Sequence, residues 1–269
     1  MIEGSTNSAL LKYTFENGNL ELINRLGVTS VEAIALSLDA KILYAVQAGV
    51  FGILDTTMGK IGSFTAVNPA GIGTAHGENG WVTIDDVDGL SFDPTTGTLY
   101  ATQRLFNSPD LLLKINPVTG KFIDNAFGSN TDYIVIGNNL RTADWIDIDD
   151  IAVDLDGNLH GTANYEGIND RFVRINKQTG VVTELNTIAI NGVPLNDVEG
   201  LSHYKDNIFF GTTGIETGNQ QGDNRNSFFK IRIDPMTSDK IINLDQNYNG
   251  YLPYDFEAIA CRICRASRY

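Results

Sequence analysis

The chain has 269 residues, with 33 acidic side chains against 19 basic ones and a formal charge of −14. Such an acidic surface repels phosphate backbones and anionic lipid, which argues against nucleic acid and membrane insertion. No apolar run approaches the ~20 residues of a membrane-spanning helix. The start, MIEGSTNSALLK, shows no signal peptide. Composition rich in Gly, Asn and Thr predicts an extracellular or periplasmic protein whose leader has been removed, and a cytoplasmic location stays open.

A short acidic motif recurs along the chain, each time at the start of a strand-like segment. An acidic residue follows a bulky apolar residue and precedes a small residue (an Asp in the third copy), then Leu or Ile, then Ala or Ser. The acidic positions are 50 to 61 residues apart, which is the size of one four-stranded propeller blade with a loop. The copies cover residues 31–35, 87–91, 148–152, 198–202 and 256–260.

The remainder of each repeat is also β-rich. A second strand-like segment follows, then a third, a tight turn and a fourth, and no long segment has helical periodicity. An Asp or Asn opens each turn, and Gly closes three of the four complete turns. The second segments cover residues 42–46, 98–102, 158–162 and 208–212, and the turns cover 55–59, 116–120, 176–180 and 234–238.

The sequence therefore predicts an all-β fold, a five-bladed β-propeller with four antiparallel strands per blade, forming one domain over residues 1–269. Both termini build the last blade, which closes the ring and removes exposed sheet edges. Its second strand is expected to be short or absent. The alternatives are an open β-solenoid or a sandwich of similar repeats, and a sandwich would not keep an acidic residue at the same point of every repeat. The predicted blades are about 28–66, 86–126, 147–188, 197–245, and 256–269 plus 8–26.

The first strand of each blade lines the axis of a propeller, so the acidic residues should form a ring at one mouth of the channel. No basic residue adjoins them in any repeat. Carboxylates crowded in this way must raise their pKa values or bind a cation. Oxygen ligands without converging His or Cys favour calcium. A purely structural ring and catalytic carboxylates are the alternatives. The predicted calcium ligands are Glu32, Asp88, Asp149, Glu199 and Glu257.

Long connections reach the same rim and should carry ligand recognition. They cover residues 65–86, 127–147, 186–197, 214–226 and 246–255. Further acidic residues lie beside the ring, namely Asp85, Asp86, Asp144, Asp147, Asp150, Asp197 and Asp255. The expected ligand-binding residues are Gln47, His76, Gln103, Arg104, Asp150 and Asn164.

Two other motifs have simpler interpretations. The segment 154–158, DLDGN, resembles half of a calcium loop but lacks the trailing Glu, and it is interpreted as a hairpin turn on the opposite rim. Cys261 and Cys264 supply only two ligands where a structural zinc site needs four, so they are interpreted as incidental thiols or a local bridge.

The repeated pattern resembles the blades of extracytoplasmic β-propeller families. Residues 148–159 are similar to blades of gluconolactonase/regucalcin-like proteins, and residues 198–202 and 256–260 resemble those of esterase-like phytase propellers. The resemblance implies a metal at the axial mouth and a metal-dependent hydrolase of the lactonase or phosphoesterase kind. Those families have six blades, and the pair of Asn metal ligands of the lactonases has no counterpart here.

The acidic ring and the long loops predict a calcium-binding propeller that acts as an extracellular binding or adhesion module. Its partner is expected to be a small molecule, a carbohydrate or a protein surface, and the protein is expected to be a monomer. The alternatives are the metal-dependent hydrolase, or a five-bladed glycosidase or sugar-binding protein whose carboxyl groups stand ~6.5–9.5 Å apart for inverting chemistry. No nucleophile is identified, so the sequence leaves open whether the protein is an enzyme.

Overall fold

The computed structural model describes residues 1–3, 8–14, 19–60, 63–137, 146–165, 168–190, 192–214, 228–236, 241–244 and 256–261. Throughout these ranges the regular elements are β-strands and no helix occurs, which confirms the all-β prediction. Within the same ranges, no helix of the length and apolarity needed to cross a membrane is found. The predicted recognition loops 214–226 (apart from Gly214) and 246–255, and also Cys264, lie outside the described residues.

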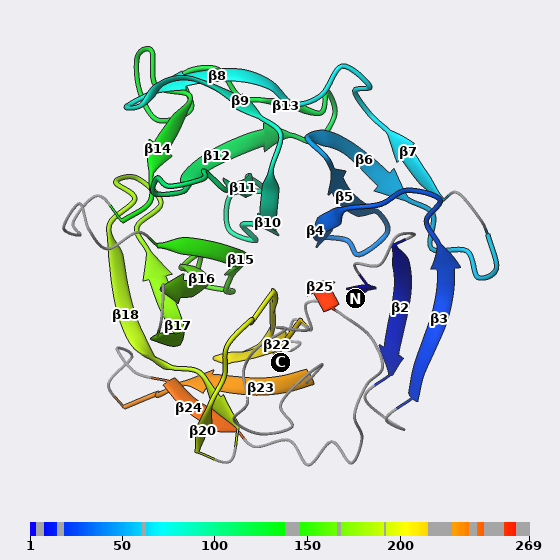
Figure 1. The fold of residues 1–269 in the computed structure, drawn as a ribbon, viewed down its shortest axis with the longest axis vertical. Coiled ribbons are helices and arrows are strands. Elements are labelled where there is room, and N and C mark those ends of the chain that lie inside the picture. Colours follow the sequence, from blue (N-terminus) through cyan, green and yellow to red (C-terminus); the bar gives the residue numbers. More distant parts are fainter. Residues whose placement is uncertain are drawn as a thin grey trace.

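Antiparallel sheets surround a central axis, and strands β4, β10, β15 and β25 lie nearest to it (Figure 1). Successive strands of each sheet lie progressively farther from the axis, as in propeller blades. Three of the sheets run in chain order: β4 (Val31–Leu36), β5 (Leu43–Gln47), β6 (Val50–Leu54) and β7 (Phe64–Ala66); β15 (Asp147–Val153), β16 (Leu159–Tyr165), β17 (Ile168–Ile175) and β18 (Val182–Thr187); and β21 (Gly200–Lys205), β22 (Ile208–Thr212), β23 (Phe228–Ile233) and β24 (Ile241–Leu244). A small hairpin is formed by β19 (Ala189–Ile190) and β20 (Val193–Pro194).

One sheet combines strands from both ends of the chain. Its order is β25 (Phe256–Ala258), β1 (Ile2–Glu3), β2 (Ala9–Thr14) and β3 (Asn19–Arg25). Ile2 pairs with Ala258 on one side and with Leu10 on the other. The second strand, expected to be short or absent after Cys264, therefore comes from the opposite end of the chain. Two residues carry too little pattern to be recognised as a strand.

The remaining sheet is larger than a four-stranded blade. Its inner strands are β10 (Val87–Phe92), β11 (Leu99–Gln103) and β12 (Leu111–Asn116), with β13 (Lys121–Phe122) paired to one end of β12. Outside β12 lie β14 (Tyr133–Val135), β8 (Gly73–Gly77) and β9 (Gly80–Ile84). Much of the segment 65–86, predicted to be a recognition loop, is therefore a hairpin that extends the outer edge of this sheet. Its sequence, GIGTAHGENG, is rich in residues with low β-propensity, which concealed the strands.

A β-bulge occurs at the same point of most innermost strands. The pairing register shifts between Val31 and Ala33, between Val87 and Gly89, and between Ile148 and Asp150, and β25 shows the same irregularity. A bulge leaves one residue outside the ladder and re-aims its side chain. The residues left out of the ladder are Glu32, Asp88, Asp149 and Glu257. The repeated acidic motif therefore encodes a repeated bulge.

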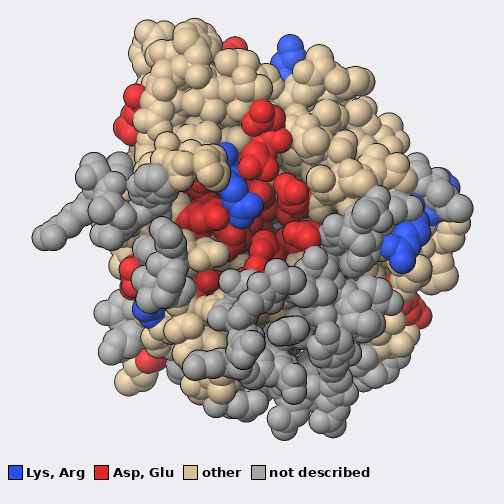
Figure 2. All heavy atoms as spheres, in the orientation of Figure 1, with Lys and Arg blue, Asp and Glu red and all other residues tan. Residues whose placement is uncertain are grey.

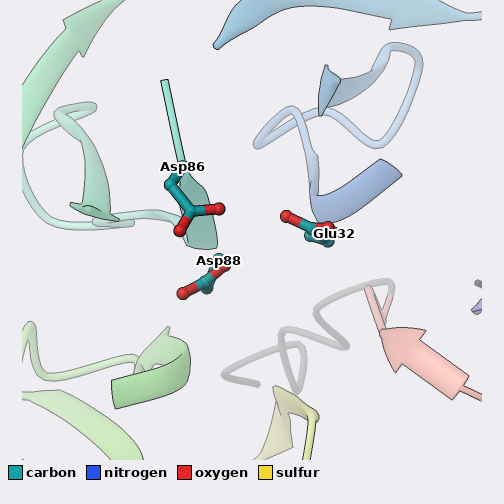
Figure 3. A group of neighbouring side chains, drawn as sticks. All are labelled: Glu32, Asp86 and Asp88. Carbon is teal, nitrogen blue, oxygen red and sulfur yellow. The ribbon is translucent and has the colours of Figure 1, made fainter. Parts of the chain in front are cut away.

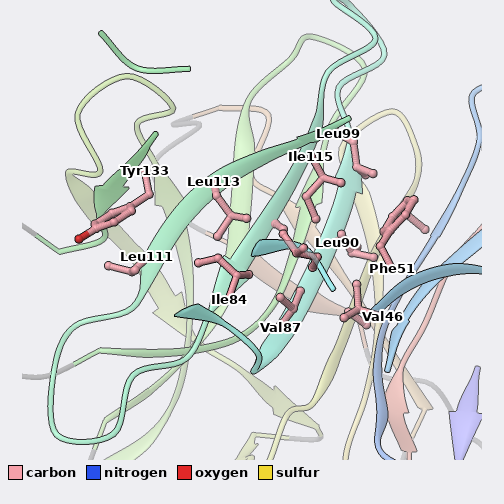
Figure 4. Packing of buried hydrophobic residues seen from close by; sticks show 14 of the residues in the cluster. Val46, Phe51, Ile84, Val87, Leu90, Leu99, Leu111, Leu113, Ile115 and Tyr133 are labelled. Carbon is pink, nitrogen blue, oxygen red and sulfur yellow. The ribbon is translucent and has the colours of Figure 1, made fainter. Parts of the chain in front are cut away.

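Neighbouring sheets pack through apolar side chains, as in the cluster that joins β4–β6 to β10–β12 (Figure 4). Between innermost strands, a small residue faces a branched one. A Cβ on Gly89 would stand 3.0 Å from Ile151, and a Cβ on Gly200 would stand 3.1 Å from Ile259. Close approach of these strands therefore requires small residues in the motif.

Side-chain oxygens also hold neighbouring sheets together. Asp110 Oδ2 accepts the N–H of Ile148 at 2.7 Å, and Asp170 Oδ2 accepts that of Val198 at 2.7 Å. Ser8 Oγ accepts the N–H of Val31 at 3.4 Å. Each acceptor lies at or near the start of the third strand of one sheet, and each donor precedes the acidic residue of the next. These bonds fix the backbone that presents the acidic side chains.

Replacing Asp110 with Ala should lower the free energy of unfolding by about 1–3 kcal/mol, because the N–H groups of Ile148 and Leu105 lose their acceptor. Urea unfolding at neutral pH measures the loss. Asp124→Ala, at an exposed position, is the control and should stay within about 0.5 kcal/mol of the parent. Equal stabilities for the two variants would contradict a role for Asp110 in joining the sheets.

Candidate functional site

Acidic side chains gather at one end of the central axis, around a basic side chain (Figure 2). We call this place the axial mouth. Asp88 and Asp149 are almost completely buried there, at 4% and 3% exposure. Four of the five acidic motifs carry a second Asp two residues before the ring position in the sequence. The axial mouth comprises Glu32, Asp86, Asp88, Arg104, Asp147, Asp149, Asp197, Glu199 and Glu257.

Three of these carboxylates form a compact cluster. Glu32 on β4 faces Asp86 and Asp88 at the start of β10, and their oxygens lie within 4.8 Å of one another (Figure 3). Burial and then the charge of Asp86 raise the pKa of Glu32, while burial raises the pKa of Asp86 and, strongly, that of Asp88. Asp88 Oδ2 is buried without a hydrogen-bond partner in the described part of the chain. Such a cluster favours either protons or a cation.

Arg104 lies between carboxylates of two innermost strands. Its Nε donates to Asp147 Oδ1 and its Nη2 to Asp149 Oδ1, both at 2.9 Å, and Nε is 3.1 Å from Asp88 Oδ2. Burial opposes the charge of the guanidinium, but the surrounding carboxylates outweigh it and raise the pKa of Arg104. The sequence showed no basic residue adjoining the acidic positions, but in the structure Arg104 neutralises part of the negative charge of the ring. Arg104 follows β11 and reaches across to β15, a contact between repeats that spacing within one repeat does not reveal.

Gln103 organises the backbone beside this cluster. Its Oε1 accepts the N–H groups of Asp85 and Asp86, each at 3.0 Å, and its Nε2 donates to the carbonyl of Arg104 at 2.8 Å. The side chain is buried, so its amide is committed to positioning Asp86 and Arg104. Gln47 and Asn164 lie at equivalent ends of β5 and β16, opposite Val31 and Asp147. All three reach the rim predicted for them.

Two predicted ligand-binding residues do not join the axial mouth. His76 lies on β8 at the outer edge of its sheet, with Nδ1 3.0 Å from the carbonyl of Asn130 and its ring against Trp81. Asp150 is buried, and its carboxylate accepts the N–H groups of Ile151 at 2.7 Å and of Leu201 at 2.8 Å. Asp150 therefore holds two innermost strands together.

The other two motifs are also located. Asp154 Oδ1 accepts the N–H groups of Asp156 at 3.0 Å and Asn158 at 2.8 Å, in the connection between β15 and β16. This is the hairpin turn that the sequence predicted. Cys261 is partly buried.

A second acidic pair occupies another part of the mouth. Burial raises the pKa of Glu199 well above its ordinary value, and the charge of Asp197 and a hydrogen bond to it act in the same direction. Burial and then Glu199 likewise raise the pKa of Asp149. Asp149 Oδ2 has no hydrogen-bond partner among the described residues. Burial and the neighbouring carboxylates therefore both favour the protonated forms of Glu199 and Asp149.

The sequence matches no protein-family model and no curated protein. Solved structures do match: one is a nidogen/laminin complex, at 14% identity over 96% of this chain and 78% of that chain, with a TM-score of 0.52. Others are a gluconolactonase from Xanthomonas campestris (8% identity, 86% and 69% covered, TM-score 0.44) and the β-propeller domain of Cps50 (Swd1) from Myceliophteria thermophila (12%, 88% and 62%, 0.44). At these identities the likeness is one of fold, and the sheets arranged around a central axis (Figure 1) make the chain a β-propeller.

Replacing Arg104 with Gln should destabilise the protein at pH 7, because the buried carboxylates of Asp88 and Asp149 lose their cation. We expect a loss of about 2 kcal/mol, less than for a fully buried pair because the Arg104 side chain is 36% exposed. The loss should shrink as the pH falls and the carboxylates take up protons. Urea unfolding at pH 7 and pH 4.5 measures both values, and a loss independent of pH would contradict a charge-based role.

Replacing Glu199 with Gln should stabilise the metal-free protein at pH 7. Because the folded-state pKa of Glu199 is raised, the folded protein binds its proton more tightly than the unfolded chain does. Stability therefore falls as the pH rises from ~4.3, the ordinary pKa of glutamate, through the raised value. Melting temperatures between pH 4 and pH 8 in EDTA test this. Glu184→Gln, on the exposed face of β18, should reproduce the parent profile, and a Glu199→Gln profile as steep as the parent's would oppose the assignment.

Proposed function

We propose that the chain is a five-bladed β-propeller whose ring is closed by the blade that both termini build. The sheets that start with β4, β10, β15, β21 and β25 would be its blades, the second of them enlarged by β14, β8 and β9 and the last including β1. Contacts between β4 and β10, β10 and β15, β15 and β21, β21 and β25, and β25 and β4 support a continuous ring of innermost strands. Such a ring would leave no innermost strand with an exposed side, consistent with a monomer.

We propose that the axial mouth binds calcium and that Glu32, Asp86 and Asp88 are ligands. The observation that carries this proposal is the convergence of three carboxylates from two strands, whose oxygens lie within 4.8 Å of one another. Calcium takes six to eight oxygen ligands in flexible geometry and suits such a donor set. The other predicted ligands surround the same mouth: Asp149, Glu199 and Glu257. Arg104 is the partner of Asp149, and Asp197 is the partner of Glu199.

The calcium-loaded mouth would serve as an extracellular binding or adhesion module. A bound cation would leave coordination positions for oxygens of a carbohydrate, a small molecule or a protein surface. The high negative charge of the chain agrees with a partner held through calcium or through its own positive charge.

The alternative is a metal-dependent hydrolase of the lactonase or phosphoesterase kind, or a glycosidase. One observation favours it: the buried Glu199, paired with Asp197, carries a raised pKa at the same axial mouth as the proposed metal cluster. A metal to polarise the substrate and a carboxylic acid to protonate the leaving group are the parts that such hydrolysis requires. A Glu199→Gln variant that keeps its calcium-dependent stabilisation but loses hydrolysis of a test substrate would favour the enzyme over the binding module.

Calcium should raise the melting temperature of the parent protein. A ligand that binds only the folded state at about a hundred times its Kd adds ~2.7 kcal/mol, which is several degrees for a chain of this size. The measurement is thermal melting in EDTA and in millimolar calcium, at pH 7 and at pH 5. The shift should be smaller at pH 5, because the raised pKa values of Glu32, Asp86 and Asp88 make protons compete with the metal.

Adjacent substitutions provide the matched control. Asp86→Asn removes one proposed ligand and should reduce the calcium-dependent shift strongly, whereas Asp85→Asn removes the same charge from a neighbouring residue outside the cluster and should preserve it. If calcium did not shift the melting temperature of the parent, or shifted those of the two variants equally, the proposed calcium site would be wrong.

A further inference from the structure

A cavity of about 450 Å³ lies at the opposite end of the axis from the acidic mouth. It is lined where the innermost strands end, including Leu36, Phe92, Val153 and Cys261. This volume falls in the range of small-molecule sites in proteins. Part of its lining is apolar and at most 4% exposed, with one residue from each of four innermost strands and one directly after β25: Ile34, Leu90, Ile151, Leu201 and Ile259.

The cavity is separate from the axial mouth. Those five apolar residues lie two positions beyond the acidic residues in each strand, so they stand between the carboxylates and the cavity. Asp150 reinforces this partition, because its buried carboxylate accepts N–H groups of Leu90 and Leu201 from strands on either side. A ligand in the cavity therefore does not reach the acidic cluster.

Two serines supply oriented donors to the cavity. Ser91 Oγ accepts the N–H of Val153 at 2.9 Å, and Ser202 Oγ accepts the N–H of Cys261 at 2.9 Å. Each oxygen is held in place by the neighbouring strand, while its own hydrogen is left to donate. Both serines line the cavity and are partly exposed. They lie at equivalent positions of β10 and β21, so two fixed hydroxyl groups enter the cavity from different sheets.

The polar lining is uncharged except at its rim. His203 lies with Nε2 2.8 Å from the carbonyl of Asp206, so Nε2 carries the proton and Nδ1 is an acceptor. Burial lowers the pKa of His203 and keeps the ring neutral at pH 7. The carboxylate of Asp39 is engaged at the surface by the hydroxyl of Ser37 at 2.7 Å and by Lys41 Nζ at 3.1 Å.

We propose that this cavity is a second binding site, for a small uncharged molecule with an apolar face and oxygens that accept hydrogen bonds from Ser91 and Ser202. Apolar walls with a few convergent polar groups are the usual composition of such sites. A charged ligand would lose its hydration on entering the cavity and would find no opposite charge to pair with, so its binding would cost free energy. The site thus selects against the cations that the axial mouth attracts.

Three nearly isosteric probes test this selectivity: benzamide (neutral), benzoate (anionic) and benzamidine (cationic at pH 7). The readout is the rate at which iodoacetamide modifies Cys261 in a Cys264→Ser protein, because Cys261 lines the cavity. Benzamide at several millimolar, above a Kd of ~1 mM expected of such a small probe, should slow the modification about twofold or more. Benzoate and benzamidine should leave the rate unchanged.

Variants separate this proposal from the calcium site. Ser91→Ala should raise the benzamide concentration needed for half-maximal protection about fivefold, which is the contribution of one hydrogen bond. Ser91→Thr keeps the hydroxyl group and should need the same concentration as the parent. Melting temperatures verify that both variants fold. Asp86→Asn, at the axial mouth, should leave protection unchanged. Lack of protection by benzamide, equal protection by all three probes, or equal protection in Ser91→Ala and Ser91→Thr would overturn the proposal.

Discussion

Repulsion among the carboxylates at the axial mouth is the constraint around which the centre of the molecule is arranged. The bulges bring these groups together at one end of the axis, and burial removes the water that would screen them. Arg104 neutralises part of the charge by facing Asp88, Asp147 and Asp149 at once. Elsewhere desolvation and repulsion raise the pKa values of Glu32 and Glu199, which favours their protonated forms. A bound cation would relieve it in a third way.

Polar bonds between sheets complement apolar packing and make this crowding tolerable. Near the mouth, Asp110 and Asp170 reach from one sheet to the backbone of the next. Toward the other end of the axis, Ser91 and Ser202 do the same. Without these oxygens, the backbone N–H groups that donate to them would be buried without a hydrogen-bond partner. The bonds therefore satisfy these N–H groups and also set the angle between neighbouring strands.

Much of this arrangement was predictable because it repeats. One acidic residue per unit at regular spacing identified the innermost strands and brought Glu32 and Asp88 to the same mouth. Features that occur once were not predictable in this way. Arg104 acts across a sheet boundary, the strand Ile2–Glu3 is too short to show alternation, and the glycine-rich hairpin that carries His76 belongs to a sheet through partners more than fifty residues away. Asp150 was predicted to bind a ligand because it is an acidic residue next to the ring, yet its carboxylate accepts hydrogen bonds from backbone N–H groups.

The sheet shared by the two ends of the chain has a consequence for biosynthesis. Strands β1, β2 and β3 leave the ribosome before the strands of the other sheets, but their innermost partner, β25, is made only after those sheets. During that interval the inner edge of β1 has no strand to pair with, and an unpaired edge is a template for aggregation. A strand of two residues offers very little such edge. The brevity of β1 therefore limits the risk of aggregation for a sheet whose strands are synthesised at widely separated times.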